Sequence, residues 1–385
     1  MSKVSIVKCK DYDSKKVIDS VFRAVSLLGG IETFLKQGDV VLIKPNLLSA
    51  RLPEEAVTTH PEVVRAAIRL VKEIKATPLV GDSPGTFFTV KDVDYVYEKT
   101  GIKRIAEEEG VELVRFDKSR IINGYPIAEV ALNVSLVISL PKLKTHALTV
   151  MTGAIKNTFG LVPGHFKVEC HRNKPKPRDF AKVILDVFQI TKPHLSIMDG
   201  VLAMEGRGPG AGNPREVGLI LASPDAVSLD LVVSKLVGLP LYKDIVINEA
   251  NERGIGEANI DNIEILGEAL ENVKIKDFKL PETAHRIDLL PNFLTNIFTW
   301  AVVFKPVIDE RLCKRCEICK DSCPVDAITV DEVTSHIDSK ICIRCFCCHE
   351  VCPYKAIFIK RNFLAELLWR EEKKVDNRGR VVRLY

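Results

Sequence analysis

The sequence predicts a protein of two units: a large α/β unit, in which helices cover a mostly parallel sheet, and a small α+β unit rich in cysteine. The first prediction depends on apolar strand-like segments that alternate with segments of helical period over roughly the first 280 residues. The second depends on two similar cysteine runs, at Cys313–Cys323 and Cys342–Cys352. A chain of 385 residues is long enough for two to three domains.

Strand-like and helix-like segments follow one another along the N-terminal unit. Residues 2–9 form a short apolar strand, residues 17–30 have helical period and end in a Gly pair that suits a C-cap, and residues 39–48 form an apolar strand that leads into a loop. A helix is predicted at 61–76, with proline in its first turn. Further strands, each followed by a polar loop, are predicted within 77–85, 136–146, 194–200 and 217–225.

The polar residues after these strands are the candidates for function, because ligands of such sheets bind outside the carboxyl ends of the strands. Lysines beside other cations or in apolar sites act as nucleophiles or anion clamps. The glycine-rich segment 205–210 would let backbone N–H groups approach an anion. The binding candidates are Lys44, Asn46, Asp82, Ser83, Lys142, Lys144, Asn157, Asp199 and Glu205, and the catalytic candidates are His146 and Lys156.

Each of these segments also has a purely structural interpretation. Lys44–Asn46 and Asp82–Gly85 have the composition of ordinary turns. The glycine-rich segment lacks the spacing of a P-loop or of a dinucleotide fingerprint, and Asp225 is placed to cap a helix. The basic segment Lys167–Asp179 either attracts an acidic substrate or is a solvated loop.

The two cysteine runs share the spacing C-x2-C-x2-C-x3-C followed by proline. This spacing is typical of bacterial iron–sulfur proteins, so it predicts two [4Fe–4S] clusters and one-electron chemistry. A structural zinc site usually takes two C-x2-C pairs instead. A disulfide framework would need an export signal, which the first residues, MSKVSIVKC, do not resemble.

Over Cys313–Ile359 the chain resembles bacterial two-cluster ferredoxins, in which the fourth cysteine of each run ligates the other cluster. The resemblance implies one cluster on Cys313, Cys316, Cys319 and Cys352, and a second on Cys342, Cys345, Cys348 and Cys323. Cys347 interrupts the repeat and is interpreted as a packing thiol beside a cluster, with a competing ligand as the alternative. Cys9 and Cys170 stand alone and are expected to be buried and inert.

The predicted organisation is an α/β domain at 1–285, an apolar linker at 286–308, a ferredoxin domain at 309–360 and a tail at 361–385.

A net charge of +4 gives no argument for nucleic-acid binding. The most apolar stretch, 287–309, is interrupted by proline, asparagine and lysine, so no transmembrane segment is expected. That stretch is interpreted as packing between domains, or as a surface for a membrane or a partner. Cluster thiolates imply a reducing compartment, so a cytoplasmic location is expected.

The segments KPNL, GDSPG, PKLKTH, GAIKNTFG and SPDAVSLD together resemble the family called domain of unknown function 362. The resemblance covers nearly the whole chain, and many members of that family carry a C-terminal two-cluster ferredoxin module. The activity of the family is largely undefined, so the resemblance implies the domain arrangement and little about the reaction.

The segment from His146 through Lys156 to Pro163-Gly164 is also similar to the N-terminal domain of nickel-pincer lactate racemases. That resemblance implies a related sheet, a catalytic role for the histidine and a lysine that carries the cofactor. The glycines before Lys156 depart from the racemase pattern, and neither His165 nor His171 matches its metal ligand by motif. These departures put a pincer cofactor in doubt, and the sequence has no flavin signature.

Two functions are compatible with these features. In the first, an iron–sulfur oxidoreductase passes electrons through both clusters to a substrate or cofactor, an anionic small molecule being one candidate, on the α/β domain. His146 would then supply a proton, the lysines would hold the anionic group, and Asp199 and Glu205 would be metal or hydroxyl ligands. In the second, the protein is a non-enzymatic electron carrier, or delivers a cluster or cofactor, and docks a redox partner protein. The first needs the strand-end residues to converge on one enclosed pocket near a cluster.

Overall fold

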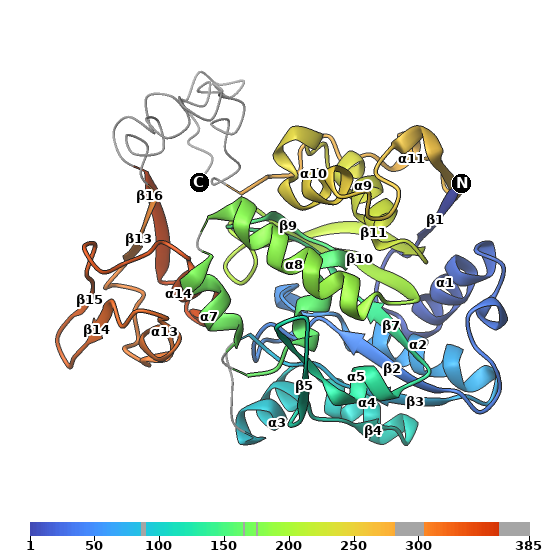
Figure 1. Cartoon of the computed structure of the whole chain (residues 1–385), viewed down its shortest axis with the longest axis horizontal. Coiled ribbons are helices and arrows are strands. Elements are labelled where there is room, and N and C mark those ends of the chain that lie inside the picture. Colours follow the sequence, from blue (N-terminus) through green and yellow to red (C-terminus); the bar gives the residue numbers. More distant parts are fainter. Residues whose placement is uncertain (86–89, 165, 175, 282–303, 362–385) are drawn as a thin grey trace.

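The computed structural model describes residues 1–85, 90–164, 166–174, 176–281 and 304–361 (Figure 1). A ten-stranded sheet forms the centre of the N-terminal unit. Its strands are β1 (Ser2–Lys8), β2 (Val40–Pro45), β3 (Thr77–Val80), β4 (Glu112–Leu113), β7 (Leu136–Leu140), β8 (Lys142–His146), β9 (Val150–Thr152), β10 (Leu195–Glu205), β11 (Asn213–Ser223) and β12 (Ile263–Gly267). A separate hairpin pairs β5 (Ser119–Ile122) with β6 (Tyr125–Ala128).

The sheet has the strand order β12-β1-β11-β10-β7-β2-β3-β4, and β8 continues alongside β10 with β9 beyond it. The run from β10 to β4 is parallel throughout, as are the pairs β1–β12 and β10–β8. Strand β11 is antiparallel to both neighbours, and β9 is antiparallel to β8. The predicted α/β class with a mostly parallel sheet is confirmed.

Helices cover both faces of this sheet (Figure 1). They are α1 (Ser14–Leu27), α2 (Pro61–Glu73), α3 (Val90–Lys99), α4 (Ile102–Glu109), α5 (Glu129–Asn133), α6 (Ala154–Asn157), α7 (Phe166–Asn173), α8 (Pro177–Thr191), α9 (Ala226–Leu236), α10 (Ile245–Glu252) and α11 (Leu270–Val273). Single 3₁₀ turns lie at Ile31–Thr33, Pro53–Glu55, Thr158–Leu161, Leu241–Lys243 and Ile260–Asn262. Pro61 opens α2 as predicted, and the Asp225 carboxylate caps α9 by accepting from Val227 N at 2.9 Å.

Alternating side chains of the strands fill two separate cores. Ile197 and Ile220 face one core, which α1, α2 and α4 cover, whereas their neighbours Met198 and Leu221 face the other, which α8, α9 and α10 cover. This alternation is the period of two that a strand imposes on its side chains. The sheet is therefore the middle layer of three, and functional groups are left to its edge.

Two segments predicted as polar loops are strands. Residues Lys142–His146 form β8, and Asp199 and Glu205 lie within β10, which carries a register shift between Gly200 and Leu202. Asp199 stands opposite Lys142 in the β10–β8 pairing. Charged residues in a buried strand are rare unless they are paired, and this pairing is made by residues far apart in the sequence.

The C-terminal unit contains two short antiparallel ribbons and two short helices. Strand β13 (Phe304–Ile308) pairs with β16 (Ile357–Arg361), and β14 (Ile328–Val330) pairs with β15 (Ser335–Ile337). The helices are α13 (Ile318–Asp321) and α14 (Cys347–Val351). The α+β character predicted for this unit is confirmed.

Strand β13 falls at the end of the segment predicted as a linker, and it belongs to the C-terminal unit through its pairing with β16. The rest of that apolar segment, from 286 to 303, and the tail from 362 lie outside the described residues. Among the helices in the described ranges, none is long and apolar enough to cross a lipid bilayer.

Candidate cluster sites and the interdomain cavity

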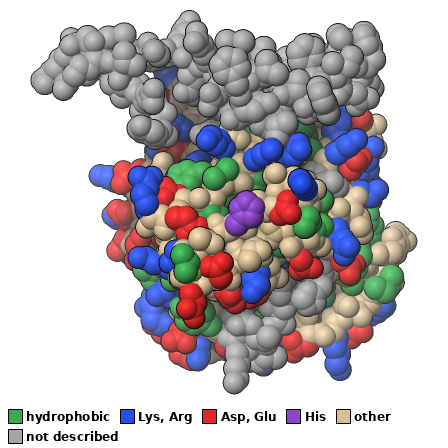
Figure 2. Space-filling model, turned by 90° about the vertical axis from the view of Figure 1, so that its left-hand side faces the viewer, with side chains coloured by type: hydrophobic (Ala, Val, Ile, Leu, Met, Phe, Trp, Pro, Cys, Tyr) green, Lys and Arg blue, Asp and Glu red, His purple; other side chains and the backbone are tan. Residues whose placement is uncertain are grey.

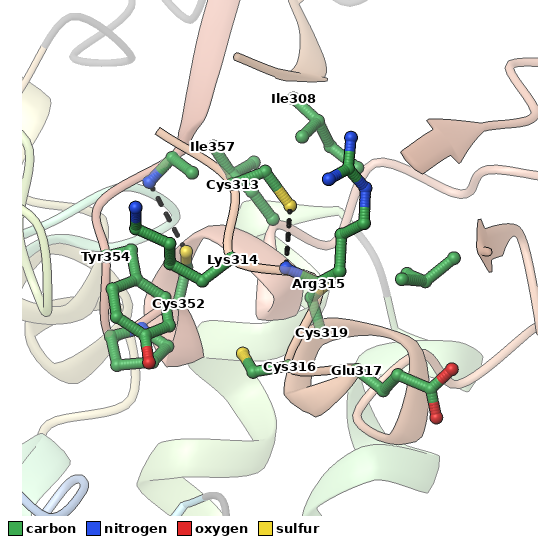
Figure 3. Close-up of a pocket in the computed structure, with 13 residues that line it drawn as sticks. Ile308, Cys313, Lys314, Arg315, Cys316, Glu317, Cys319, Cys352, Tyr354 and Ile357 are labelled. Atoms are coloured by element: carbon green, nitrogen blue, oxygen red, sulfur yellow. Dashed lines mark hydrogen bonds between the residues drawn. The ribbon is translucent and has the colours of Figure 1, made fainter. Parts of the chain in front are cut away.

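The eight cysteines of the repeat gather into two groups, each around its own cavity. Cys313, Cys316, Cys319 and Cys352 line a cavity of about 350 Å³ (Figure 3), which we call the outer site. Cys323, Cys342, Cys345 and Cys348 line a second cavity of about 300 Å³, which we call the inner site. Each group therefore takes three cysteines from one run and the fourth from the other, the combination that the ferredoxin resemblance implies.

Both sites have the surroundings that thiolate ligands need. At the outer site, Ala356 N donates to Cys352 Sγ at 3.3 Å and Arg315 N donates to Cys313 Sγ at 3.4 Å (Figure 3). At the inner site, Ala327 N donates to Cys323 Sγ at 3.2 Å. Amide donors stabilise negative charge on sulfur and tune iron–sulfur centres. The remaining walls are largely apolar, so the residues present fit a cluster at each site.

The backbone repeats together with the cysteines. Three non-glycine residues in or just after the first run have positive φ, namely Arg315, Glu317 and Asp326, at 52°, 61° and 52°. Their counterparts in the second run, Arg344, Phe346 and Lys355, have φ of 60°, 63° and 53°. Non-glycine residues adopt this conformation rarely, so its recurrence at equivalent positions indicates two copies of one loop that present ligands in the same way.

The glycine-rich segment 205–210 of the α/β unit packs against the C-terminal unit. A Cβ atom on Gly210 would lie 2.2 Å from the Glu350 carbonyl oxygen, so only glycine allows this approach. The His349 imidazole lies between two carbonyl oxygens, with Nε2 3.3 Å from Arg207 O and Nδ1 2.7 Å from Ile357 O. The Arg207 guanidinium stacks over the Phe358 ring at 4.3 Å from its centroid. This segment docks one unit on the other.

Arg51 also joins the two units, through charge-assisted hydrogen bonds. Its buried guanidinium donates to Cys352 O at 2.7 Å and to Pro353 O at 2.8 Å. It also pairs with Glu55 at 2.9 Å, so the charge is compensated on the α/β side. Charge-assisted hydrogen bonds are about twice as strong as neutral ones. Arg51 thus fixes the loop that carries the fourth cysteine of the outer site.

A cavity of about 750 Å³ lies between the two units and is lined by both. The end of β2, the loop after β3, β9, α6 and α7 form one wall, and α14 with Ser322 forms the other. In Figure 1, α7 and α14 lie side by side at this boundary. The polar and ionisable lining residues are Lys44, Asn46, Asp82, Ser83, Thr152, Lys156, Asn157, Lys167, His171, Ser322, Cys347 and Glu350.

Five of the nine predicted binding residues and one of the two predicted catalytic residues therefore meet in this cavity. Lys44 Nζ contacts Asp82 Oδ1 at 2.7 Å and Asn157 Oδ1 at 3.1 Å, and burial lowers the pKa of Lys44 although Asp82 opposes this. A Cβ atom on Gly160 would lie 2.3 Å from Asp82 Oδ1. Glycine at that position gives the Lys44–Asp82 pair its space.

Lys156 is the cavity lysine without a polar partner. In the described part of the chain its ammonium makes no hydrogen bond or ion pair, and its nearest aromatic contact is the Phe180 ring, 5.9 Å from Nζ to the centroid. Burial lowers its pKa, while Glu350 and Cys347 act in the opposite direction. The Asp230 carboxylate holds α6, which carries Lys156, by accepting from Ala154 N at 2.6 Å and Ile155 N at 3.0 Å.

His146 lies behind the cavity wall, against Glu350 of α14. Its Nε2 is 3.2 Å from Glu350 Oε1, and its Nδ1 accepts from Leu148 N at 3.0 Å and Thr149 N at 3.3 Å. Burial lowers the pKa of His146 well below its ordinary value, so the imidazole is neutral. Glu350 therefore stands between His146 and the cavity, and the predicted histidine reaches the cavity through it.

The four remaining predicted residues do not line the cavity, and the fold gives each a partner elsewhere. Lys142 and Asp199 form a fully buried ion pair at 2.8 Å, and Tyr12 hydrogen-bonds both of them. Lys144 donates to Val57 O at 2.6 Å, and Glu205 accepts from Lys279 N at 3.0 Å. These partners account for the four residues as parts of the fold.

Six of the polar cavity residues were not among the predicted site residues, and three of them, Lys167, His171 and Glu350, carry side chains that can be charged. Lys167 and His171 lie in the segment interpreted as either a basic loop or an acidic-substrate contact, but 166–173 is helix α7 and both side chains are buried. Lys167 donates to Ser83 O and to Pro84 O, at 3.0 Å for the second, and burial lowers its pKa to about 7. No sequence motif around Glu350 predicts its role, because it reaches the cavity only through the packing of the C-terminal unit on the α/β unit. His165 lies outside the described residues.

Comparison with known proteins identifies both units. The sequence matches the family described as Domain of unknown function (DUF362) over residues 41–235, and the 4Fe-4S dicluster domain over residues 305–353. A protein of Synechocystis sp. that is described as thylakoid-associated is 36% identical over 304 residues, which cover 77% of this chain and 93% of that protein.

Two solved structures share a weaker likeness. A crystal structure of a Thermotoga maritima protein has 14% identity and a TM-score of 0.36 over 57% of each chain. The lactate racemase apoprotein of Thermoanaerobacterium thermosaccharolyticum has 12% identity and a TM-score of 0.36 over 64% of this chain and 58% of that one. Both likenesses span less than two thirds of either chain and say nothing about function. The matches of the preceding paragraph place this chain in the DUF362 family, with a 4Fe–4S ferredoxin domain at its C-terminus.

Proposed function

We propose that this protein transfers electrons through two [4Fe–4S] clusters to a small molecule bound in the interdomain cavity. One observation carries the proposal: helix α14 supplies Cys348 to the inner site and Cys347 and Glu350 to the cavity wall. A molecule in the cavity would therefore lie one short helix away from the inner site. Such an arrangement fits an iron–sulfur oxidoreductase better than a carrier with a flat docking edge.

One difference in access supports a direction for the transfer. Cys316 of the outer site is the exposed cysteine of the eight, and the inner site has two buried cysteines, Cys345 and Cys348, where the outer site has one, Cys352. The clusters, when bound, supply one-electron transfer. A redox partner protein would then donate at the outer site, and the inner site would deliver to the cavity. The chain positions the two ends by the fixed docking of its units, through Arg51 and the glycine-rich segment.

The charges of the cavity support an anionic ligand. Lys44, Lys156 and Lys167 line it, and of these only Lys44 is paired with a carboxylate. Lys156 has no polar partner in the described ranges, so its ammonium is free to bind an oxyanion. A lysine is a common anion clamp at such sites. His146 would act on the ligand through Glu350.

The test is reoxidation of the reduced protein. The anaerobically purified holoprotein is reduced chemically and mixed with candidate acceptors, and the return of the visible cluster absorption is followed. We expect Lys156→Met and His146→Ala to slow reoxidation by any active small acceptor at least tenfold, and exposed Lys320→Met to leave it unchanged. Reoxidation at the wild-type rate in both cavity variants, for every active acceptor, would disprove this site.

The alternative is a non-enzymatic carrier that docks a redox partner. It predicts one stoichiometric redox partner and no turnover of small molecules. The description of the Synechocystis relative as thylakoid-associated is compatible with a partner in an electron-transfer chain. A reducing, cytoplasmic compartment remains part of the proposal, because oxygen and oxidants attack exposed cluster thiolates. The polar cavity beside the inner site, lined by both units, favours the enzymatic function.

A further inference from the structure

The cavity walls carry polar atoms that the fold leaves without partners. Within the described ranges, the buried atoms Asn46 Oδ1, Thr152 Oγ1, His171 Nδ1 and Glu350 Oε1 accept or donate no hydrogen bond, and all four residues line the cavity. Buried polar groups are almost always hydrogen-bonded, since an unmade bond costs the desolvation of the group. Several such atoms around one cavity mark it as a polar site, where water or a bound ligand supplies the partners.

The α/β wall needs an acceptor. Lys156 carries three N–H donors and has no acceptor among the described residues. Lys167 lies on the same wall, where Ser83 and Pro84 carbonyls accept from it. An oxyanion such as a carboxylate or a phosphate would satisfy the Lys156 donors and would be attracted by both charges.

The ferredoxin wall needs a donor. Neither oxygen of Glu350 accepts a hydrogen bond from the described residues. The neutral imidazole of His146 lies close, with Nε2 3.2 Å from Oε1, but this contact lacks hydrogen-bond geometry. Because His146 Nδ1 accepts from two backbone amides, the proton of the neutral ring is assigned to Nε2, facing Glu350. His146 packs against Glu350 without a hydrogen bond, so it limits where the carboxylate can lie and leaves Glu350 to accept from a molecule in the cavity.

We infer that the cavity binds a small molecule that carries both an oxyanion group and a hydrogen-bond donor, with the oxyanion at Lys156 and the donor, a hydroxyl or an ammonium group, at Glu350. The inference rests on the proposed function in taking this cavity as the ligand site, and it adds the substrate class. It makes Glu350, from the ferredoxin unit, a ligand-contacting residue and His146 a positioning residue. A ligand bound in this way touches both units, and it contacts α14 between Cys348 and Cys352.

Four probes separate the two required groups. Glycolate carries an oxyanion and a hydroxyl, glycine an oxyanion and an ammonium, acetate the oxyanion alone, and ethylene glycol hydroxyls alone. Binding to the oxidised, anaerobically purified holoprotein is measured by calorimetry, without electron transfer. We expect glycolate or glycine to bind about tenfold or more tightly than acetate, since one hydrogen bond to a charged group is lost. Ethylene glycol should not bind measurably.

Matched variants locate the two contacts. Lys156→Met should abolish binding of the anionic probes, and Glu350→Gln should remove most of the advantage of the donor-bearing probe over acetate. Asp321 is the counterpart of Glu350 in the first repeat and is exposed, so Asp321→Asn serves as the control. His146→Gln should also weaken the donor-bearing probe, at unchanged cluster absorption.

Two outcomes would overturn the inference: equal affinity for acetate and both donor-bearing probes, or binding of ethylene glycol at the level of glycolate. Both comparisons use the wild-type protein, so they stand even if a variant fails to fold. Selective binding with no effect of Lys156→Met on reoxidation would instead contradict the proposed electron delivery and leave the ligand class standing.

Discussion

The two cysteine repeats have the same ligand spacing and the same loop conformation, but they face different surroundings. In the first copy, Glu317, Lys320 and Asp321 on and beside α13 are exposed. In the second copy the equivalent residues, Phe346, His349 and Glu350, are buried against the α/β unit. The cysteines are the same in both copies, whereas the residues between them differ and give one copy a solvent-exposed surface and the other a surface packed on the α/β unit.

The first copy and the ribbons beside it form an outer surface of mixed charge. Figure 2 shows Lys and Arg side chains interspersed with Asp and Glu on this face. The second copy replaces charged positions by an aromatic ring, an imidazole held by two carbonyl oxygens, and a carboxylate in the cavity wall. The comparison teaches that one duplicated loop faces solvent in one copy and the interdomain cavity in the other; in the proposed function, the first is the electron entry and the second is part of the ligand site.

The largest expected effect comes from removing one cysteine of each site. If both sites hold clusters, the protein contains about eight iron atoms, and Cys316→Ala or Cys342→Ala should lower this to about four. Cys352→Ala should give the electron paramagnetic resonance (EPR) spectrum of Cys316→Ala, although the two residues belong to different runs. The crossed assignment fails if Cys352→Ala instead resembles Cys342→Ala, and Cys9→Ala is the neutral control.

A smaller effect, on the stability of the C-terminal unit, is expected from removing the hydrogen bonds between Arg51 and the second repeat. Arg51→Met removes two hydrogen bonds to the carbonyls of Cys352 and Pro353, each of which contributes roughly 1.5–3 kcal/mol when the donor is charged and buried. We expect a loss of about 3 kcal/mol in the free energy of unfolding of the C-terminal unit, measured by denaturant titration. Arg311 pairs with Asp309 on the exposed side of the same unit, and Arg311→Met should have no measurable effect.

Gly210→Ala tests the docking contact itself. The added Cβ would lie 2.2 Å from the Glu350 carbonyl oxygen, so the units must move apart. Overpacking of this kind costs roughly 1–3 kcal/mol. Limited proteolysis should cleave between the units faster, and affinity for the anionic probes should fall. Unchanged proteolysis and unchanged affinity would show that the second repeat does not need this close approach.

The smallest expected effect is on the pH dependence of the free energy of unfolding, to which Lys167 in the cavity wall contributes. Burial lowers the folded-state pKa of Lys167 to about 7, below its ordinary value of 10.5. Between these values the unfolded state holds a proton that the folded state has released, so the contribution of Lys167 makes stability rise with pH. Lys167→Met should lower this slope by up to about 1.4 kcal/mol per pH unit. Lys320→Met, on the exposed repeat, should leave the slope unchanged, and an unchanged slope in Lys167→Met would contradict its burial.

The sequence predicted the features that local patterns encode. Periodicity predicted the α/β class and cysteine spacing predicted the iron–sulfur runs, while the grouping of the eight cysteines came from the resemblance to two-cluster ferredoxins. The sequence analysis placed Lys142 and Asp199 in polar loops, whereas both lie in buried strands. Charged residues favour a loop prediction, and their ion pair between β8 and β10 joins residues that are far apart in the sequence. Glu350 was missed for the same reason at a larger scale, since the contact of α14 with the cavity depends on docking by Arg51 and Gly210. Long-range partners are the part that composition and spacing do not encode.

The central claim is that the cavity ligand lies beside the inner site, against the helix α14 that carries Cys348. The direct measurement is EPR of the reduced protein with and without a saturating cavity probe, glycolate or glycine, whichever binds more tightly. Cys316→Ala retains the inner site and Cys342→Ala retains the outer site. We predict that the probe changes the spectrum of Cys316→Ala and leaves that of Cys342→Ala unchanged. A change confined to Cys342→Ala, or no change in Cys316→Ala when calorimetry shows the probe bound, would contradict the account.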